Sequence, residues 1–213
     1  NFLRKQGDGF RDYFYDINDL QAKFTVRASD RHQFGMKLGV YDERSNSTYL
    51  GLTTPQFLID PNQNSVPNDL LKLRRFSGSL SHTATLTPSA ILNTSVFAYN
   101  TVRDWRRQNF DRADLGKSYL AIEGDPSVPR GAIYLLDAAV NRNRGFTVAG
   151  WQTTLGAEYH LAGLRSKLDT GVRYVYEEAD DKEIEGSRFD ASTGVVLSDE
   201  DRFGKAFSVF AQN

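Results

Sequence analysis

The feature that most constrains the fold is a strict alternation of apolar and polar residues along segments of about ten residues. From Leu20 to Ala28, every second residue is apolar and the residues between them are polar. Successive side chains of a β-strand point to opposite faces, so such a segment predicts a strand with one apolar and one polar face. The pattern recurs in four further segments, residues 33–40, 76–86, 151–161 and 167–177.

Residues 90–106, approximately, also form a predicted strand, but the sequence leaves its facing open. Phe97 and Tyr99 share a face with the polar residues Asn93 and Ser95, so neither face is clearly apolar. The strand is therefore predicted without an assignment of its two faces.

The predicted strands are longer than the five or six residues typical of soluble proteins. Their length suits a tilted strand that crosses a membrane. Residues 2–5 and 205–212 have the character of half-strands, which brings the expected total to about eight. Little helix is expected, and a stretch such as Leu70–Arg75 would form a single turn inside a loop.

The expected connections alternate between short and long. The short turns are residues 29–31, 87–89 and 162–164, and the long loops are residues 44–72, 107–145 and 178–203. Outer-membrane barrels show this asymmetry between tight periplasmic turns and long extracellular loops. We therefore predict an all-β fold, an antiparallel transmembrane β-barrel in the bacterial outer membrane. The whole chain, residues 1–213, would supply a fragment of about eight strands.

A soluble antiparallel sandwich is the alternative, because its strands also alternate. The uninterrupted Ser/Thr row from Ser77 to Thr85 favours a barrel with a wet lumen. Aromatic residues near the predicted strand ends also favour it, since they would form an interfacial girdle. These aromatics are Tyr41, Phe76, Trp105, Trp151 and Tyr176.

Composition excludes several classes of site. The chain has no cysteine, which rules out thiolate metal sites, disulfides and cysteine nucleophiles. The 26 basic and 27 acidic residues nearly balance, so no nucleic-acid partner is expected. No apolar run is long enough for a membrane helix. The first residues, Asn1–Lys5, carry no signal peptide, and the chain begins and ends as if cut from a longer one.

Several motifs in the first half of the chain resemble a known family. The most specific is Thr48–Thr53 (Thr-Tyr-Leu-Gly-Leu-Thr), which is followed by Phe57, Asp60-Pro61 and Asp69. Supporting motifs are Gln6–Asp12, Leu80-Ser81-His82 and Arg103-Asp104-Trp105. Together, over about residues 6–106, they resemble the barrel of TonB-dependent outer-membrane receptors, in particular the branch similar to ferric citrate receptors.

This resemblance implies a function for the parent protein. Members of the family have a barrel of about 22 strands filled by an N-terminal plug that contacts TonB. The ligand is a ferric chelate such as a siderophore or iron(III) dicitrate, taken up from outside. No plug or TonB-contact segment is recognisable here, so TonB would be a partner through a plug elsewhere in the parent. Outer-membrane lipid and lipopolysaccharide are the other expected partners, and no cofactor is expected.

Arginines beside a tryptophan are the candidate ligand contacts. Arg103, Arg106 and Arg107 cluster beside Trp105 where a strand is expected to meet its long loop, and Arg75 lies at the start of a neighbouring strand. Guanidinium groups bind carboxylates through charge-assisted, bidentate hydrogen bonds, which suits an anionic ferric chelate. Tyr49, in the family-like motif, completes the set. The alternative is that these arginines pair with loop carboxylates or lipopolysaccharide phosphates.

No catalytic residues and no metal ligands are predicted, and the protein is not expected to be an enzyme. His32, His82 and His160 lie on separate segments without the spacing of a zinc helix. The acidic runs at 180–185 and 199–201 are expected to be solvated loops. Two functional alternatives stay open: a passive, porin-like small barrel and a soluble β-sandwich binding module.

Overall fold

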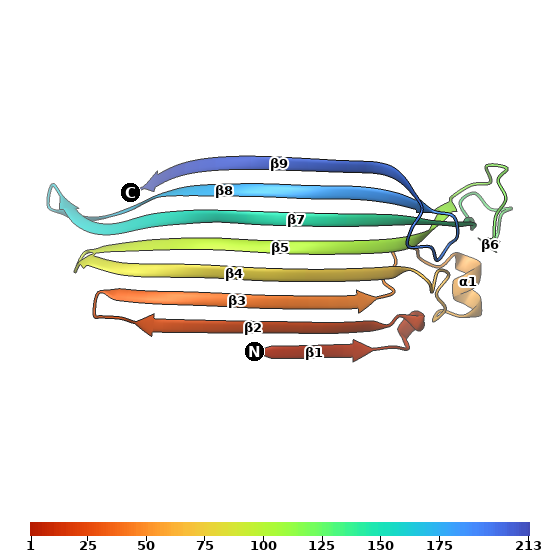
Figure 1. Cartoon of the computed structure of the whole chain (residues 1–213), viewed down its shortest axis with the longest axis horizontal. Coiled ribbons are helices and arrows are strands. Elements are labelled where there is room, and N and C mark those ends of the chain that lie inside the picture. Colours follow the sequence, from red (N-terminus) through yellow and green to blue (C-terminus); the bar gives the residue numbers. More distant parts are fainter.

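The computed structural model describes residues 1–213, apart from the side chain of Phe10. It is almost entirely β-structure (Figure 1). The strands are β1 (Phe2–Gly7), β2 (Tyr15–Arg27), β3 (His32–Ser45), β4 (Leu70–Thr87), β5 (Ala90–Asp111), β6 (Ala121–Gly124), β7 (Ala132–Leu161), β8 (Leu164–Gly186) and β9 (Val195–Gln212). The helical elements are the helix α1 (Thr54–Ile59) and a 3-10 turn, Phe10–Asp12.

All nine strands belong to one antiparallel sheet with the order β1-β2-β3-β4-β5-β7-β8-β9, and β6 pairs with β7. Each long strand therefore lies beside its neighbour in the chain, as Figure 1 shows. This arrangement confirms the predicted all-β antiparallel fold and the count of about eight wall strands. The single sheet also excludes the two packed sheets of a sandwich.

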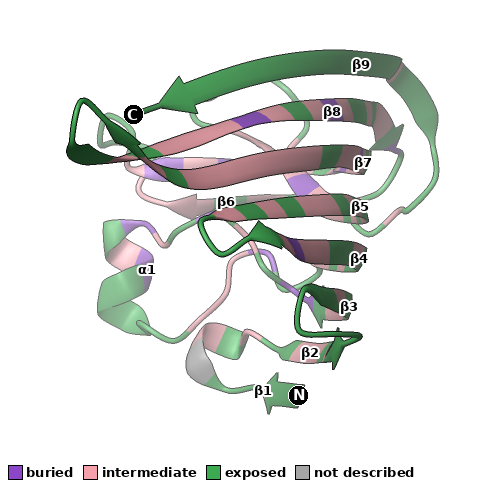
Figure 2. Cartoon of the chain, turned by 90° about the vertical axis from the view of Figure 1, so that its left-hand side faces the viewer, coloured by how far each residue is buried: buried purple, intermediate pink, exposed green. Residues whose placement is uncertain are grey.

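The sheet is curved, as Figure 2 shows. Its apolar residues lie on the convex face, opposite to the face from which Trp105 contacts the β3–β4 loop. Residues paired across neighbouring strands share a face, so the register defines rows that cross the sheet. One row on the convex face is apolar or aromatic in every long strand from β2 to β9, that is, in all of them except β6. Its members are Phe24, Met36, Leu80, Val96, Trp151, Tyr174 and Phe207.

The concave face carries the polar residues of the same strands, and the register settles the facing of β5. Phe97 and Tyr99 pair with Ser79 and Ser77, so both aromatics stand on the concave face with the polar residues around them. Phe97 has room there because it lies over Gly150, where an added Cβ would come within 2.7 Å of the Phe97 ring. The glycine on the neighbouring strand thus explains an aromatic residue on the polar face.

The short turns are as predicted, but two of the three long loops are shorter than the sequence indicates. β5 continues to Asp111 and β7 begins at Ala132, so about half of the expected loop 107–145 is strand. β8 and β9 likewise extend into the expected loop 178–203 and leave only residues 187–194 between them. Charged residues occupy both faces of the β8 and β9 extensions, whereas mostly apolar residues occupy both faces of β7 from Ala132 to Val140. The alternation that marks a half-buried strand is lost in both cases.

Two further sequence expectations are wrong. Leu70–Arg75 is the start of β4 and not a helical turn, because it pairs with both β3 and β5. In the aromatic girdle, Phe76, Trp151 and Tyr176 are on the convex face, whereas Tyr41 and Trp105 are on the concave face. Spacing along a strand gives the face only once the register with its neighbours is known.

The loop between β3 and β4 packs against the loop end of the sheet on its concave side, with α1 and β6 (Figure 2). A small core forms there from Leu50, Val66 and Leu135, and Phe110 packs against it. α1 starts with a capping box, in which the Gln56 side chain accepts a hydrogen bond from the Thr53 backbone N–H at 2.9 Å. These contacts make the loop a packed lid over one end of β5 and β7.

Candidate anion-binding site

Arg103, Trp105 and Arg107 lie at alternate positions on β5, so all three side chains project from the concave face. They lie near the loop end of the strand, where the β3–β4 loop crosses the same face. The indole of Trp105 donates a hydrogen bond to the carbonyl of Ser47 at 2.9 Å, which fixes that loop to the strand.

Arg107 is held between two aromatic rings. Its guanidinium carbon is 4.6 Å from the ring centre of Tyr49 and 4.8 Å from that of Trp105. The two rings meet edge to face, with centroids 5.8 Å apart, and Arg103 lies 5.8 Å from the Trp105 ring. Cation–π contacts of this kind hold a guanidinium in place without neutralising its charge.

β7 adds two further arginines to this cationic cluster. Arg144 lies directly opposite Arg103, and Arg142 lies directly opposite Trp105. Like charges directly opposite one another destabilise a sheet. The arrangement therefore costs stability, and its persistence needs a compensating partner or a function.

Carboxylates on β8 neutralise only the β7 members of the cluster. Arg144 pairs with Asp181 at 2.9 Å, and Arg142 pairs with Glu183 at 2.5 Å. Arg103 and Arg107 form no ion pair with any side chain that the structure describes. Their Nε atoms are also buried without a hydrogen-bond partner among the described residues. The cluster thus presents two unneutralised guanidinium groups beside Tyr49 and Trp105.

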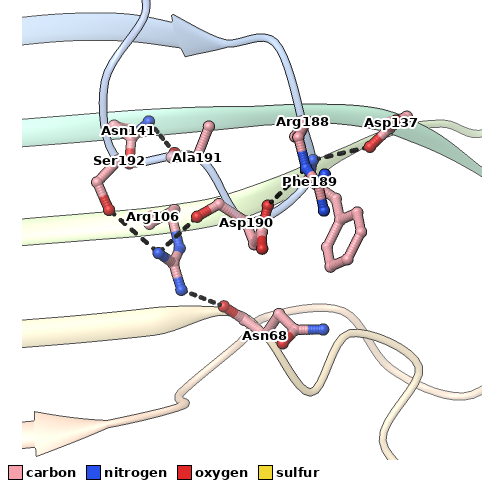
Figure 3. A network of polar contacts seen from close by, with 9 residues as sticks. All are labelled: Asn68, Arg106, Asp137, Asn141, Arg188, Phe189, Asp190, Ala191 and Ser192. Carbon is pink, nitrogen blue, oxygen red and sulfur yellow. Dashed lines mark hydrogen bonds and ion pairs between the residues drawn. The ribbon is translucent and has the colours of Figure 1, made fainter.

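The structure does not place Arg106 in this cluster. Arg106 faces the convex side, where its Nη1 donates to the carbonyl of Asp190 at 2.7 Å and to Ser192 Oγ at 3.1 Å. Its Nη2 donates to the carbonyl of Asn68 at 3.1 Å (Figure 3). Arg106 therefore joins the β3–β4 connection to the β8–β9 loop, a structural role that its place in the sequence does not reveal.

Arg75 is on the concave face but outside the cluster. It lies opposite Tyr41 on β3 and Thr101 on β5, one row further from the loop end than Arg103. Its guanidinium carbon is 5.5 Å from the Tyr41 ring centre. Of the five predicted contacts, Arg103, Trp105 and Tyr49 come together, whereas Arg75 and Arg106 lie apart from them.

Asp69 is a buried carboxyl group beside the cluster. It is 3% exposed, and its Oδ1 accepts a hydrogen bond from the Gln108 backbone N–H at 2.7 Å, beside a bulge in β5. Burial raises the pKa of Asp69 to about 6, although hydrogen bonds from Gln108 and Thr48 and the charges of Arg107 and Arg106 act in the opposite direction. Asp69 is thus a buried acid that anchors the bulge next to Arg107.

Sequence reasoning includes Arg107 in the arginine run but misses Arg142 and Arg144. It assigns residues 107–145 to a loop, which hides the register that places β7 beside β5. The alternating basic residues at 142 and 144 are the signal that could have extended the strand.

Two histidines that are fifty residues apart in the sequence meet on the convex face. His32 Nδ1 and His82 Nε2 are 3.0 Å apart, and the two rings stack with centroids 5.2 Å apart. The ring of Phe34 also stacks on that of His82, with centroids 4.5 Å apart. Within the described part of the chain, no group of three or more His, Asp or Glu side chains is placed to hold a metal ion.

Among the described residues, neither α1 nor any other helix is long and apolar enough to cross a lipid bilayer.

Comparison with known proteins supports the fold. No protein-family model matches the sequence, and no curated protein matches it. Among solved structures, the chain is similar to the crystal structure of the ferric citrate transporter FecA in its unliganded form. The superposition covers 99% of this chain with a TM-score of 0.75 and 16% sequence identity.

The chain spans 28% of the length of that transporter. At this level of identity the likeness establishes architecture. The chain therefore has the fold of a partial antiparallel β-barrel wall, with the packed loops at one end of its strands.

Proposed function

We propose that this chain is part of an outer-membrane receptor that takes up an anionic ferric chelate, such as a ferric siderophore or iron(III) dicitrate, in a TonB-dependent manner. The observation that carries the proposal is the pair of unneutralised guanidinium groups, Arg103 and Arg107, beside Tyr49 and Trp105 on the concave face. A chelate that displays carboxylates would complete their hydrogen bonding and relieve the repulsion between Arg103 and Arg144.

The convex face supports a location in a membrane. Its apolar rows on β3 extend from Phe34 to Val40, roughly 20 Å at about 3.4 Å per residue, and their large side chains are exposed. An exposed apolar band of this kind marks a lipid-facing surface. Toward the loop end, the band gives way to charged residues such as the Asp42–Arg74 pair, with 3.1 Å between Asp42 Oδ1 and Arg74 Nε.

Those charged rows are suited to the headgroup region. Arg44, Lys72 and Arg74 lie on adjacent strands of the convex face, just beyond the apolar band. We propose that they contact lipopolysaccharide phosphates, while the concave face meets the chelate and the plug of the parent receptor. TonB would act on that plug and not on this chain.

The test is uptake by cells that produce the full-length protein. Iron-55 citrate should accumulate only when TonB is present and the inner membrane is energised, and a protonophore should abolish accumulation. Equal accumulation in cells without TonB would overturn active transport and favour the porin-like alternative. Binding of the chelate to the cells without accumulation inside them would limit the role of the site to binding at the cell surface.

A further inference from the structure

The concave wall holds a second polar site, distinct from the arginine cluster. A hollow of about 690 Å³ lies across β2–β5, between the cluster and the short turns. Its floor is formed by small residues, Gly39, Ser77 and Ser79, and Phe97 and Tyr99 stand along one side. Pockets that bind small molecules have volumes of this order, about 300–1,000 Å³.

The hollow exists because small residues meet in neighbouring strands. Gly39 lies opposite Ser77, and the serine hydroxyl occupies the space that a Cβ on Gly39 would need, at 2.6 Å. The aromatic rings of Phe97 and Tyr99 rise beside this low floor. The Ser/Thr row of β4, recognised in the sequence as lumen-facing, is thus also the bottom of a concavity.

Cations dominate the hollow. Lys23 and Lys37 are directly opposite one another on β2 and β3, and Arg75 lines the end nearer the loops. None of the three forms an ion pair with a side chain that the structure describes. Asp19 is the one carboxylate among the lining residues, so the hollow carries a net positive charge. Two lysines placed in direct opposition destabilise the sheet unless an anion bridges them.

We propose that this hollow is a second binding site for a carboxylate-rich anion, which would bridge Lys23 and Lys37 and receive hydrogen bonds from Ser77 and Ser79. Arg75, which sequence reasoning assigns to the external site, belongs to this lower site. The hollow lies on the same face as the arginine cluster. Lys23 is six residues along β2 from the row of Arg103, about 20 Å at roughly 3.4 Å per residue.

The substrate assignment rests on the proposed function, because it takes the anion to be the same chelate that the arginine cluster captures. A chelate released from the cluster would meet the hollow next on its way along the wall. Anion binding by the hollow is itself independent of transport, since it follows from the lysine pair and the serine floor.

The experiment uses the purified full-length protein with citrate and ferric citrate as probes. In an Arg103→Gln/Arg107→Gln background, which removes the upper site, calorimetry should still detect citrate binding. Adding Lys23→Gln and Lys37→Gln should weaken that residual binding at least tenfold. The matched control is Lys205→Gln, a lysine on the convex face in the adjacent row, which should leave it unchanged.

Three outcomes of these measurements test the second site separately from the proposed function. Residual citrate binding that survives the lysine changes overturns the proposal, whatever the uptake assay shows. Loss of binding together with TonB-independent uptake keeps the site and rejects only the proposed function. Unchanged citrate binding with a lowered thermal midpoint of the protein would also overturn it, because the lysines would then hold a protein segment in place of an anion.

Discussion

Arg103 and Arg107 differ from Arg106 in their hydrogen bonding. Arg106 donates three hydrogen bonds to two loops, whereas Arg103 and Arg107 lie against aromatic rings and form no ion pair among the described residues. Arg106 therefore has a structural role in the loops, and Arg103 and Arg107 are the positions of the proposed ligand binding.

Replacing Arg103 and Arg107 with glutamine should weaken binding of ferric citrate by at least tenfold. Each lost charge-assisted hydrogen bond is worth about 1.5–3 kcal/mol. Equilibrium binding of iron-55 citrate to the full-length protein measures the effect. Arg106→Gln is the comparison: it should change affinity less than threefold but increase protease cleavage within residues 187–194. Equal affinity losses in the two variants would contradict the assignment.

The candidate site was partly within reach of the sequence. Three of the predicted residues do lie together: Arg103, Trp105 and Tyr49. They could be found because Trp105 is an aromatic residue near a predicted strand end and Tyr49 belongs to a loop with a distinctive motif. Arg106 could not be separated from them, because the sequence does not show which carbonyl groups the surrounding loops present. Arg144 required the register of two strands that are distant in the chain.

At the level of elements, the β3–β4 loop is held by a titratable group. Asp69 has a pKa of about 6 in the folded protein, against its usual 3.8. Between these values the folded state binds more protons than the unfolded state, so stability falls as pH rises from about 4 to 6. Above pH 6 the loss is complete, about 3 kcal/mol at about 1.4 kcal/mol per pKa unit.

This predicts that the loop opens more easily at neutral than at acidic pH. An environment-sensitive probe on a cysteine introduced at the exposed Asn62 would follow opening in urea. The midpoint should be lower at pH 7 than at pH 4.5. Asp69→Asn should remove most of the difference, since the amide does not titrate. A pH dependence that persists in full in that variant would assign the effect to another group.

The parts of the strands that have one apolar and one polar face could be predicted from the sequence. Their continuations toward the loops, where this alternation is absent, could not. Leu20–Ala28 was recognisable because apolar residues of the convex face and polar residues of the concave face alternate there. The outer part of β7 has mostly apolar residues on both faces from Ala132 to Val140 and polar residues on both faces from Asn141 to Arg144, so it shows no alternation. The physical cause is burial on both sides of the sheet in that region, where the adjacent residues Tyr134 and Leu135 are both buried, so no alternating pattern is selected.

For the whole molecule, the proposed membrane location requires a sheet with one apolar face and one polar face. Leu80 and Ser81 are neighbours on β4 that face in opposite directions, and both are exposed. In the full-length protein in lipid vesicles, Leu80→Arg should lower the free energy of unfolding by about 2–4 kcal/mol. Ser81→Arg should lower it far less, because its side chain would enter the lumen. Urea titrations compare the two variants, and equal losses would contradict the assignment of the convex face to lipid.

The order of the sheet also bears on how such a wall assembles. Every long strand pairs with its predecessor along the chain, with β6 as the single detour. Three of the pairings are closed by turns of two to four residues, so these hairpins form without ordering any distant segment. Growth from one edge, hairpin by hairpin, keeps each new strand's backbone paired as it joins. The slow steps should then be the pairing of β3 with β4 and of β5 with β7. In both cases a long connection has to fold before the next strand can pair.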